Sequence, residues 1–150
     1  MVKVADYIDQ ERIFFLDKGV AKSEVLSLLI DSINSNANII DTAQFRADVY
    51  ERESLMSTGI GLGIAIPHCK STAVKKMVIA IAIAKEPFEY NALDGKPVQF
   101  VVMIAAGKDQ YKEYLTLLSK IAFLLKNRQK RERVIAATSS EEIYTLFSSI

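Results

Sequence analysis

The sequence predicts an α/β fold, a sheet covered by helices on both sides, within a single domain. Its length of 150 residues suits one hydrophobic core. Short apolar segments typical of strands alternate with amphipathic segments typical of helices. Between residues 77 and 84 isoleucine alternates with alanine, so both faces of that strand are apolar and both should pack against helices.

The first third of the chain is expected to form one strand and two helices. Residues 12–16 are a short apolar run and the expected first strand. Ser23 is the expected N-cap of the first helix, and Asp41 with Gln44 has the spacing of a capping box for the second. The inward side of the first helix should carry Val25, Leu26, Leu29 and Ile33. That of the second should carry Phe45, Val49 and either Leu55 or Met56.

Strands and helices continue to alternate toward the C-terminus. Three strands should follow, over residues 64–66, 77–84 and 100–106. The first of them should stop at Pro67, which has no N–H to donate. Residues 109–126 have helical periodicity, and Ser139 with Glu142 should cap a last helix. The inward stripe over 109–126 should carry Leu115, Leu118, Ile121, Ala122 and Leu125.

Composition and charge exclude several classes of function. The formal net charge of +1 argues against a nucleic-acid partner, which usually requires a strongly basic face. No apolar run is long enough to span a bilayer, and the first residues turn polar too soon for a secretory signal. A single cysteine cannot form an internal disulfide. We therefore expect a cytoplasmic protein with no direct membrane insertion.

His68, the only histidine, is the first candidate for chemistry. It follows an expected buried strand and Pro67, and open α/β sheets commonly bind ligands at such an edge. Neutral imidazole is a good nucleophile, and a phosphohistidine bond is labile enough to pass its phosphoryl group onward. The alternative is a packed or surface histidine without a chemical role.

The residues around His68 give weaker signals. Gly59, Gly61 and Gly63 could bring backbone N–H groups close to a phosphoryl group, with a plain flexible loop as the alternative. They form neither a Walker A loop nor a dinucleotide fingerprint. Cys69 should point away from His68 and act as a small packing residue. One histidine and one cysteine are too few for a closed zinc site, so we expect no metal and no organic cofactor.

One longer stretch, residues 52–69, resembles the signature of the type-2 (fructose/mannitol) enzyme IIA domain of the bacterial phosphotransferase system, a group that includes nitrogen-regulatory enzyme IIA proteins. Its centre reads Gly-Ile-Ala-Ile-Pro-His, and the likeness extends loosely over residues 1–150. The resemblance implies one domain with a mixed five-stranded sheet flanked by helices on both sides. It also implies a phosphoryl carrier in sugar uptake. HPr would phosphorylate His68 at its Nε2 (tele) position, and the group would pass to a cysteine of a IIB domain.

The resemblance further implies supporting residues, namely Arg52, Ser57 and Thr58. The Arg52 guanidinium could neutralise phosphoryl charge, and the hydroxyl of Ser57 or Thr58 could donate to its oxygens. Without the resemblance, Arg52 would be interpreted as a surface arginine paired with a nearby glutamate. Family members commonly carry a second histidine close to the first, and Tyr114 stands at that place here. We expect Tyr114 to lie within reach of His68, where its neutral hydroxyl donates a hydrogen bond but shuttles no proton near pH 7.

Two other functions stay open on the sequence. One is a regulatory enzyme IIA-like protein whose phosphorylation state controls a protein partner. The other is an interaction domain in which His68 is not phosphorylated. Sugar recognition in systems of this kind lies in the membrane component, so this sequence carries no sugar specificity.

Overall fold

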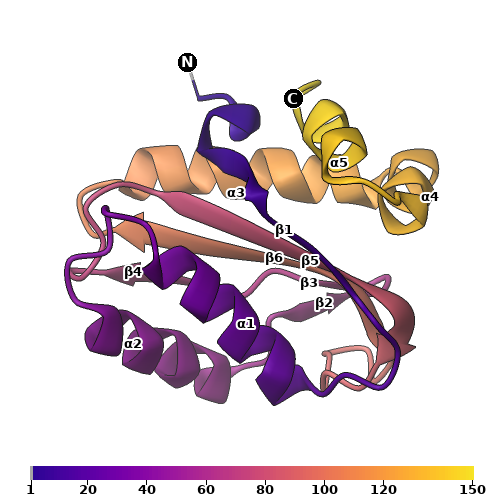
Figure 1. Cartoon of the computed structure of the whole chain (residues 1–150), viewed down its shortest axis with the longest axis horizontal. Coiled ribbons are helices and arrows are strands. Elements are labelled where there is room, and N and C mark those ends of the chain that lie inside the picture. The colour runs from indigo at the N-terminus through magenta and orange to yellow at the C-terminus, as the bar shows by residue number, and fades with distance from the viewer. Residues whose placement is uncertain (1) are drawn as a thin grey trace.

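A mixed sheet lies between two layers of helices, as Figure 1 shows. The computed structural model describes residues 2–150. Within that range the sheet has six strands: β1 (Ile8–Leu16), β2 (Gly59–Gly61), β3 (Ile64–Ala65), β4 (His68–Ser71), β5 (Val78–Phe88) and β6 (Val98–Gly107). Their order is β1-β5-β6-β3-β2, with β4 also paired to β6. The pairs β5–β6 and β2–β3 are antiparallel and the others are parallel, so the predicted mixed α/β fold is confirmed.

The difference between the expected five strands and the observed six has one cause. β3 and β4 both run parallel to β6, one after the other, separated by Ile66 and Pro67. Pro67 cannot donate to the ladder, but its carbonyl still accepts a hydrogen bond from Ile104 N at 2.9 Å. The proline therefore interrupts one strand without detaching the chain from β6, and the strand stops at Pro67 as predicted.

The helices form one layer on each face of the sheet. They are the short 3-10 helix η1 (Val4–Tyr7) and the α-helices α1 (Lys22–Asn34), α2 (Thr42–Leu55), α3 (Tyr111–Lys126), α4 (Arg128–Ala136) and α5 (Ser140–Phe147). In Figure 1, α1 and α2 lie on one side of the sheet and α3, α4 and α5 on the other. None of the helices described within residues 2–150 combines the length and the apolar character that crossing a bilayer requires.

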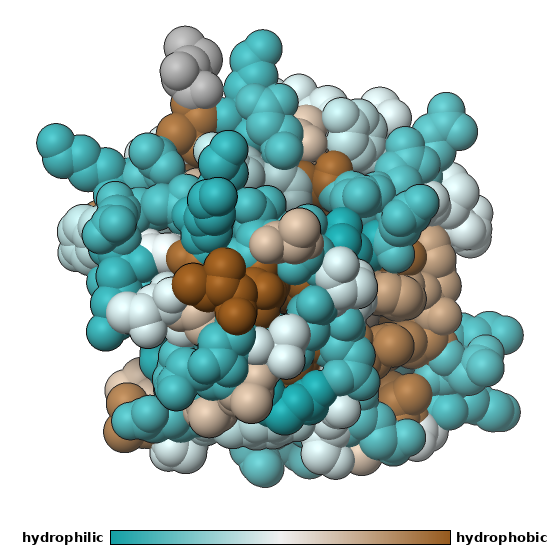
Figure 2. All heavy atoms as spheres, turned by 60° about the vertical axis from the view of Figure 1, so that its left-hand side comes forward, coloured by the Kyte–Doolittle hydropathy of each residue, from teal (hydrophilic) through white to brown (hydrophobic). Residues whose placement is uncertain are grey.

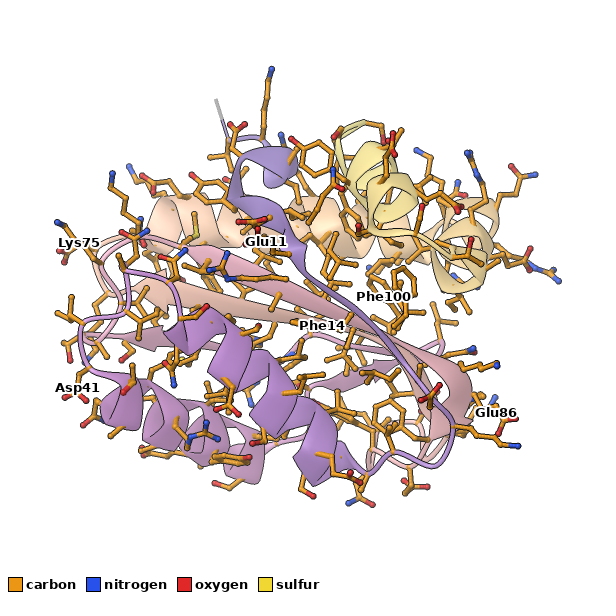
Figure 3. All side chains as sticks on the ribbon, viewed as in Figure 1. Glu11, Phe14, Asp41, Lys75, Glu86 and Phe100 are labelled. Carbon is orange, nitrogen blue, oxygen red and sulfur yellow. The ribbon has the colours of Figure 1, made fainter. Side chains whose placement is uncertain are left out.

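The alternation of isoleucine and alanine in β5 builds two separate cores, as predicted. The alanine side, which includes Ala80, packs with the inward residues of α1 and α2. The isoleucine side, which includes Ile79, packs with α3, α4 and α5. On that second side the ring of Phe100 stacks on Phe147 with 6.1 Å between centroids, and Figure 3 shows Phe100 near the layer that holds α5. The small alanine side chains let the first layer lie close to the sheet.

Two of the three predicted helix caps are present. Asp41 accepts a hydrogen bond from Gln44 N at 3.0 Å, although the Gln44 side chain bonds Asp48 and does not complete the box. Ser139 accepts from Glu142 N at 3.2 Å. These side chains satisfy N–H groups that the first turn of a helix cannot pair internally.

Two boundaries in the first third differ from the prediction. Ser23 is not the N-cap of α1, because Ala21 holds that position and Glu24 accepts a hydrogen bond from Ala21 N at 3.0 Å. The first strand begins at Ile8, four residues before the predicted start. Residues 9–11 are exposed and polar because β1 pairs only with β5 and lies at the edge of the sheet, so hydropathy alone did not mark them as strand.

Most predicted inward residues of α1 and α2 are buried, whereas on α3 Ile121 and Leu125 are buried as predicted and Leu115, Leu118 and Ala122 are not. The buried residues on α1 and α2 include Val25, Leu26, Leu29, Ile33, Phe45 and Val49. Leu55 and Met56 are 77% and 59% exposed, because α2 ends there. The buried face of α3 consists of Tyr114, Leu117, Ile121, Leu124 and Leu125. Tyr114 therefore occupies the core stripe, whereas Leu115, about 100° further around the helix, is exposed and Leu118 is half-buried against the core.

The glycine-rich run forms a hairpin and not a flexible loop. Gly59 lies at the start of β2, and β2 pairs with β3. A Cβ at Gly59 would lie 2.6 Å from the Cβ of Ala92, so the glycine permits the loop after β5 to lie directly on the hairpin. Gly61 and Gly63 have φ values of +102° and +78°, a backbone conformation that residues with a Cβ atom rarely adopt. Gly61 and Gly63 thus permit the turn of the hairpin, and Gly59 permits its close contact with Ala92.

We predict that Gly59→Ala destabilises the protein by about 1–3 kcal/mol, since an added methyl group forces backbone displacement in a packed site. The φ of Gly59 is not in the left-handed region, so the effect isolates the contact with Ala92. Urea unfolding followed by circular dichroism measures the change. A variant as stable as the parent would contradict the packing role of Gly59.

Candidate functional site

A pocket lies where β4 forms the edge of the sheet between the two helical layers. Its wall comes from α2, from β4 and from the first two turns of α3. The lining residues that matter below are Asp48, Arg52, Leu55, His68, Lys70, Tyr111, Tyr114, Leu115 and Leu118. Figure 2 shows the end of the molecule to which β4 points, where hydrophilic side chains predominate and apolar ones form separate groups. Leu115 and Leu118 of α3, both predicted to face the core, line this pocket, where Leu115 is exposed and Leu118 half-buried.

His68 is half-buried at the start of β4, with its ring in a defined orientation. Its Nδ1 lies 2.6 Å from the carbonyl oxygen of Ile66. A carbonyl can only accept a hydrogen bond, so Nδ1 carries the proton in this contact. Nε2 therefore keeps its lone pair. The ring is held as the tautomer whose nucleophilic nitrogen is the tele nitrogen.

Burial lowers the pKa of His68 from its ordinary value of 6.5, because a charged imidazolium loses hydration inside the protein. The hydrogen bond to Ile66 acts in the opposite direction, and the positive charges of Arg52 and Lys70 lower the pKa further. The net effect keeps the imidazole neutral at pH 7. Neutral imidazole is the form that attacks an electrophilic phosphorus.

Arg52 lies in the last turn of α2 and lines the pocket with His68. Its Nη1 donates to the carbonyl oxygen of Met56 at 2.9 Å, which fixes part of the guanidinium. Within residues 2–150 no carboxylate forms an ion pair with Arg52, so the alternative of a glutamate-paired arginine is wrong for this structure. The remaining donors of the fork are available to an anion in the pocket.

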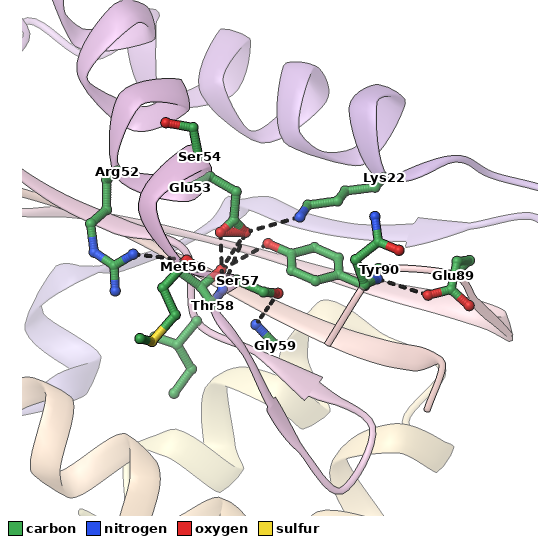
Figure 4. A network of polar contacts seen from close by, with 12 residues as sticks. Lys22, Arg52, Glu53, Ser54, Met56, Ser57, Thr58, Gly59, Glu89 and Tyr90 are labelled. Atoms are coloured by element: carbon green, nitrogen blue, oxygen red, sulfur yellow. Dashed lines mark hydrogen bonds and ion pairs between the residues drawn. The ribbon is translucent and has the colours of Figure 1, made fainter. Parts of the chain in front are cut away.

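Ser57 and Thr58 do not line the pocket. Thr58 is buried, and its hydroxyl donates to Glu53 at 2.7 Å and contacts the Tyr90 hydroxyl at 2.9 Å. Lys22 approaches the same carboxylate at 3.5 Å, as Figure 4 shows. Ser57 accepts a hydrogen bond from Gly59 N at 3.1 Å. The two hydroxyls therefore bind protein groups, and the network that includes Thr58 joins the end of α2 to the start of β2.

Tyr114 lies beside His68, as predicted, with 5.8 Å between the ring centroids and 46° between the ring planes. It is 4% exposed, and burial raises its pKa to about 12, so the phenol is neutral. Sequence reasoning missed a further neighbour, Lys70, whose Nζ lies 4.3 Å from the centroid of Tyr111. The sequence did carry a signal for Lys70, because residues two positions apart in a strand project from the same face and Lys70 is two residues after His68.

Cys69 lies on the opposite side of β4 from His68 and belongs to the core under α1 and α2, as predicted. Burial raises the pKa of its thiol to about 12. Among the described residues no three His, Cys, Asp or Glu side chains gather as a metal site would require. The pocket lining places one imidazole among three cationic side chains, Arg52, Lys70 and Lys108, and two phenols.

Comparisons with known proteins agree with this arrangement. The profile described as "Phosphoenolpyruvate-dependent sugar phosphotransferase system, EIIA 2" matches residues 6–150. The fructose-specific EIIABC component of Bacillus subtilis (strain 168) is 29% identical over 98% of this chain, and the chain spans only 23% of that relative.

Two solved structures share the fold. The nitrogen regulatory protein IIA-Ntr from Neisseria meningitidis has a TM-score of 0.86 at 27% identity, covering 96% of this chain and 98% of its own. Enzyme IIA mannitol of Escherichia coli, solved in complex with phosphorylated enzyme IIB mannitol, has a TM-score of 0.75 at 20% identity, covering 95% of this chain and 98% of its own. The second likeness concerns the fold alone.

We predict that ¹⁵N NMR shows His68 as the Nδ1–H tautomer with a pKa below 6.5, and that Arg52→Gln raises this pKa because a repulsive positive charge is removed. The pKa of His68 is lower in the folded state than in the unfolded state, so the unfolded state binds a proton more readily. The free energy of unfolding should therefore be unaffected by His68 above pH 6.5 and should decrease as the pH falls below 6.5. Arg128→Gln, on the exposed α4, should leave the titration unchanged. An Nε2–H tautomer at pH 7 would contradict the prediction.

Proposed function

The chain belongs to the EIIA type 2 family of the phosphoenolpyruvate-dependent sugar phosphotransferase system and is a phosphotransferase component, and from this premise we propose that Nε2 of His68 accepts the phosphoryl group. The observation that supports the proposal best is the hydrogen bond from Nδ1 to the Ile66 carbonyl. It leaves the Nε2 lone pair free, and His68 lines the same pocket as Arg52 and Lys70. A rigid nucleophile next to fixed positive charge suits transfer of an anionic group.

The donor in this proposal is the phosphohistidine of HPr. The Nε2 lone pair of His68 attacks the phosphorus, the P–N bond to the donor breaks, and the donor nitrogen recovers the electron pair. The Nδ1 proton stays on His68 in its bond to Ile66, so the product is an imidazolium that readily releases the group again. A cysteine thiolate of a IIB domain then attacks the phosphorus, the P–Nε2 bond breaks, and Nε2 recovers its electron pair as the neutral imidazole forms again. The enzyme IIB complex of the E. coli mannitol protein supports this choice of acceptor.

The supporting residues act in different ways in this proposal. Arg52 neutralises the phosphoryl oxygens through its free N–H groups, and Tyr114 donates one hydrogen bond from the other wall of the pocket. Ser57 and Thr58 support the phosphoryl group indirectly. Thr58 lies just after α2, and its N–H and hydroxyl donate to the Glu53 carboxylate in the last turn of that helix. These bonds hold the last turn in place and thereby keep Arg52 at the pocket. No metal and no organic cofactor takes part.

A regulatory role is the second candidate. The N. meningitidis nitrogen regulatory protein, at 27% identity, is about as similar to this chain as the fructose relative, at 29% identity. In this case phosphorylation of His68 would change the affinity for a protein partner. The two candidates share the first step and differ in the fate of the group. Transfer from phosphorylated protein to a purified IIB domain of a sugar permease separates them.

We predict that incubation with enzyme I, HPr and phosphoenolpyruvate adds one acid-labile phosphoryl mass to the protein and that His68→Ala abolishes the gain. His68 is the only histidine in the chain, so no other imidazole can replace it. Intact-mass spectrometry before and after mild acid measures the result. Cys69→Ser serves as the matched control, because the thiol is buried in the core with residues of α1 and α2. Phosphorylation that survives His68→Ala would disprove the assignment.

We predict that Tyr114→Phe slows phosphoryl transfer by about tenfold or less. A neutral hydrogen bond contributes about 0.5–1.5 kcal/mol, and about 1.4 kcal/mol corresponds to a factor of ten in rate. Phenylalanine keeps the buried ring beside His68, so the fold should be unchanged. Rapid-quench kinetics with phosphorylated HPr measures the rate. Complete loss of phosphorylation in a folded variant would make Tyr114 essential and not supporting.

A further inference from the structure

We propose that Lys70 is a second cation that binds the phosphoryl group on His68, and that its ammonium rests on the ring of Tyr111 while the histidine is unphosphorylated. The proposal rests on the proposed phosphorylation of His68. In this proposal Lys70, two residues after His68, contacts the phosphoryl group directly. It also assigns Tyr111 a role, as the resting place of that cation.

The position of Lys70 follows from the register of β4. His68 pairs with Ile104 and Lys70 with Ala106 on the neighbouring strand β6. Side chains two residues apart in a strand project from the same face, so Lys70 and His68 emerge side by side. Cys69, between them, points into the core on the other face. The backbone that fixes the nucleophile thus also fixes the origin of the lysine side chain.

The resting contact of Lys70 is aromatic and not ionic. Its Nζ lies 4.3 Å from the centroid of Tyr111 and 6.0 Å from that of Tyr114, and the second of these rings contacts His68. In the part of the chain that the structure describes, no carboxylate forms an ion pair with Lys70. A cation above a partly exposed ring is held weakly, whereas a phosphoryl dianion attracts it strongly. The ammonium can therefore leave the ring when the anion forms.

Lys70 and Arg52 approach the nucleophile from different elements. Arg52 comes from α2 and Lys70 from β4, so the two cations can contact different oxygens of one phosphoryl group. Asp48, an acidic group of the same pocket, already accepts hydrogen bonds from Ser71 and Gln44 at 2.5 and 2.7 Å, which occupies its carboxylate. The charge of Lys70 already acts on the ring, because it contributes to the lowered pKa of His68.

The first experiment measures the equilibrium of phosphoryl transfer between HPr and the protein for the wild type and for Lys70→Gln, Lys70→Arg and Lys85→Gln. We expect Lys70→Gln to shift the equilibrium constant toward HPr by roughly tenfold, the effect of losing one charge-assisted contact at a partly exposed site. Lys70→Arg keeps the positive charge and should therefore have an equilibrium constant close to that of the wild type. Lys85, near the far end of β5, lies about 20 Å along the sheet from His68, and its loss should change nothing.

The second experiment follows the ε-methylene protons of Lys70 by NMR. While the ammonium lies over Tyr111, the ring current should shift these protons upfield, and Tyr111→Leu should abolish the shift. Phosphorylation of the wild type should abolish it as well. A shift that persists in the phosphorylated protein would disprove the movement, and a Lys70→Gln equilibrium equal to that of the wild type would disprove the contact. A wild type that takes up no phosphoryl group would instead overturn the proposed function.

Discussion

The pairing of β4 with β6 is the constraint on which the site depends. β6 is buried along nearly its whole length and pairs with three other strands, so it is the most firmly held segment of the sheet. His68 lies opposite Ile104 of β6, and the carbonyl of Pro67 receives the hydrogen bond of that same residue. His68 is thus attached to the centre of the fold through β6, while β4 itself is an edge strand. Rigid support of this kind gives a transferred group a fixed target.

The pocket combines both layers of the sandwich, because β4 is an edge strand with a helix on each side. α2 is tied to β4 by the bond from Ser71 to Asp48 and to β2 by the bonds from Thr58 to Glu53. Arg52 lies between these two attachments in the sequence, so its position is determined from both ends. The other wall is the first part of α3, which is fixed to the second core through Tyr114. Loss of packing in either layer would therefore displace residues that line this pocket.

The sequence was informative where one physical requirement decided the structure and less so where two competed. The alternation in β5 and the caps at Asp41 and Ser139 each answer to a single demand, either burial or an unpaired N–H. The N-terminal part of the α3 face was misplaced because Tyr114, a phenol that also lines the pocket, takes the core position in place of Leu115, whereas Ile121 and Leu125 further along are buried as predicted. Thr58 could not be placed, since its carboxylate partner and Tyr90 are brought to it only by the fold.

The burial of Cys69 has a consequence for the conditions under which the protein can work. Only a thiolate attacks electrophiles or is readily oxidised, and a thiol with a pKa of about 12 in the core forms almost none near pH 7. Cys69, next to His68, is therefore a poor nucleophile and is oxidised slowly. Peroxide or glutathione disulfide should therefore react only slowly with Cys69.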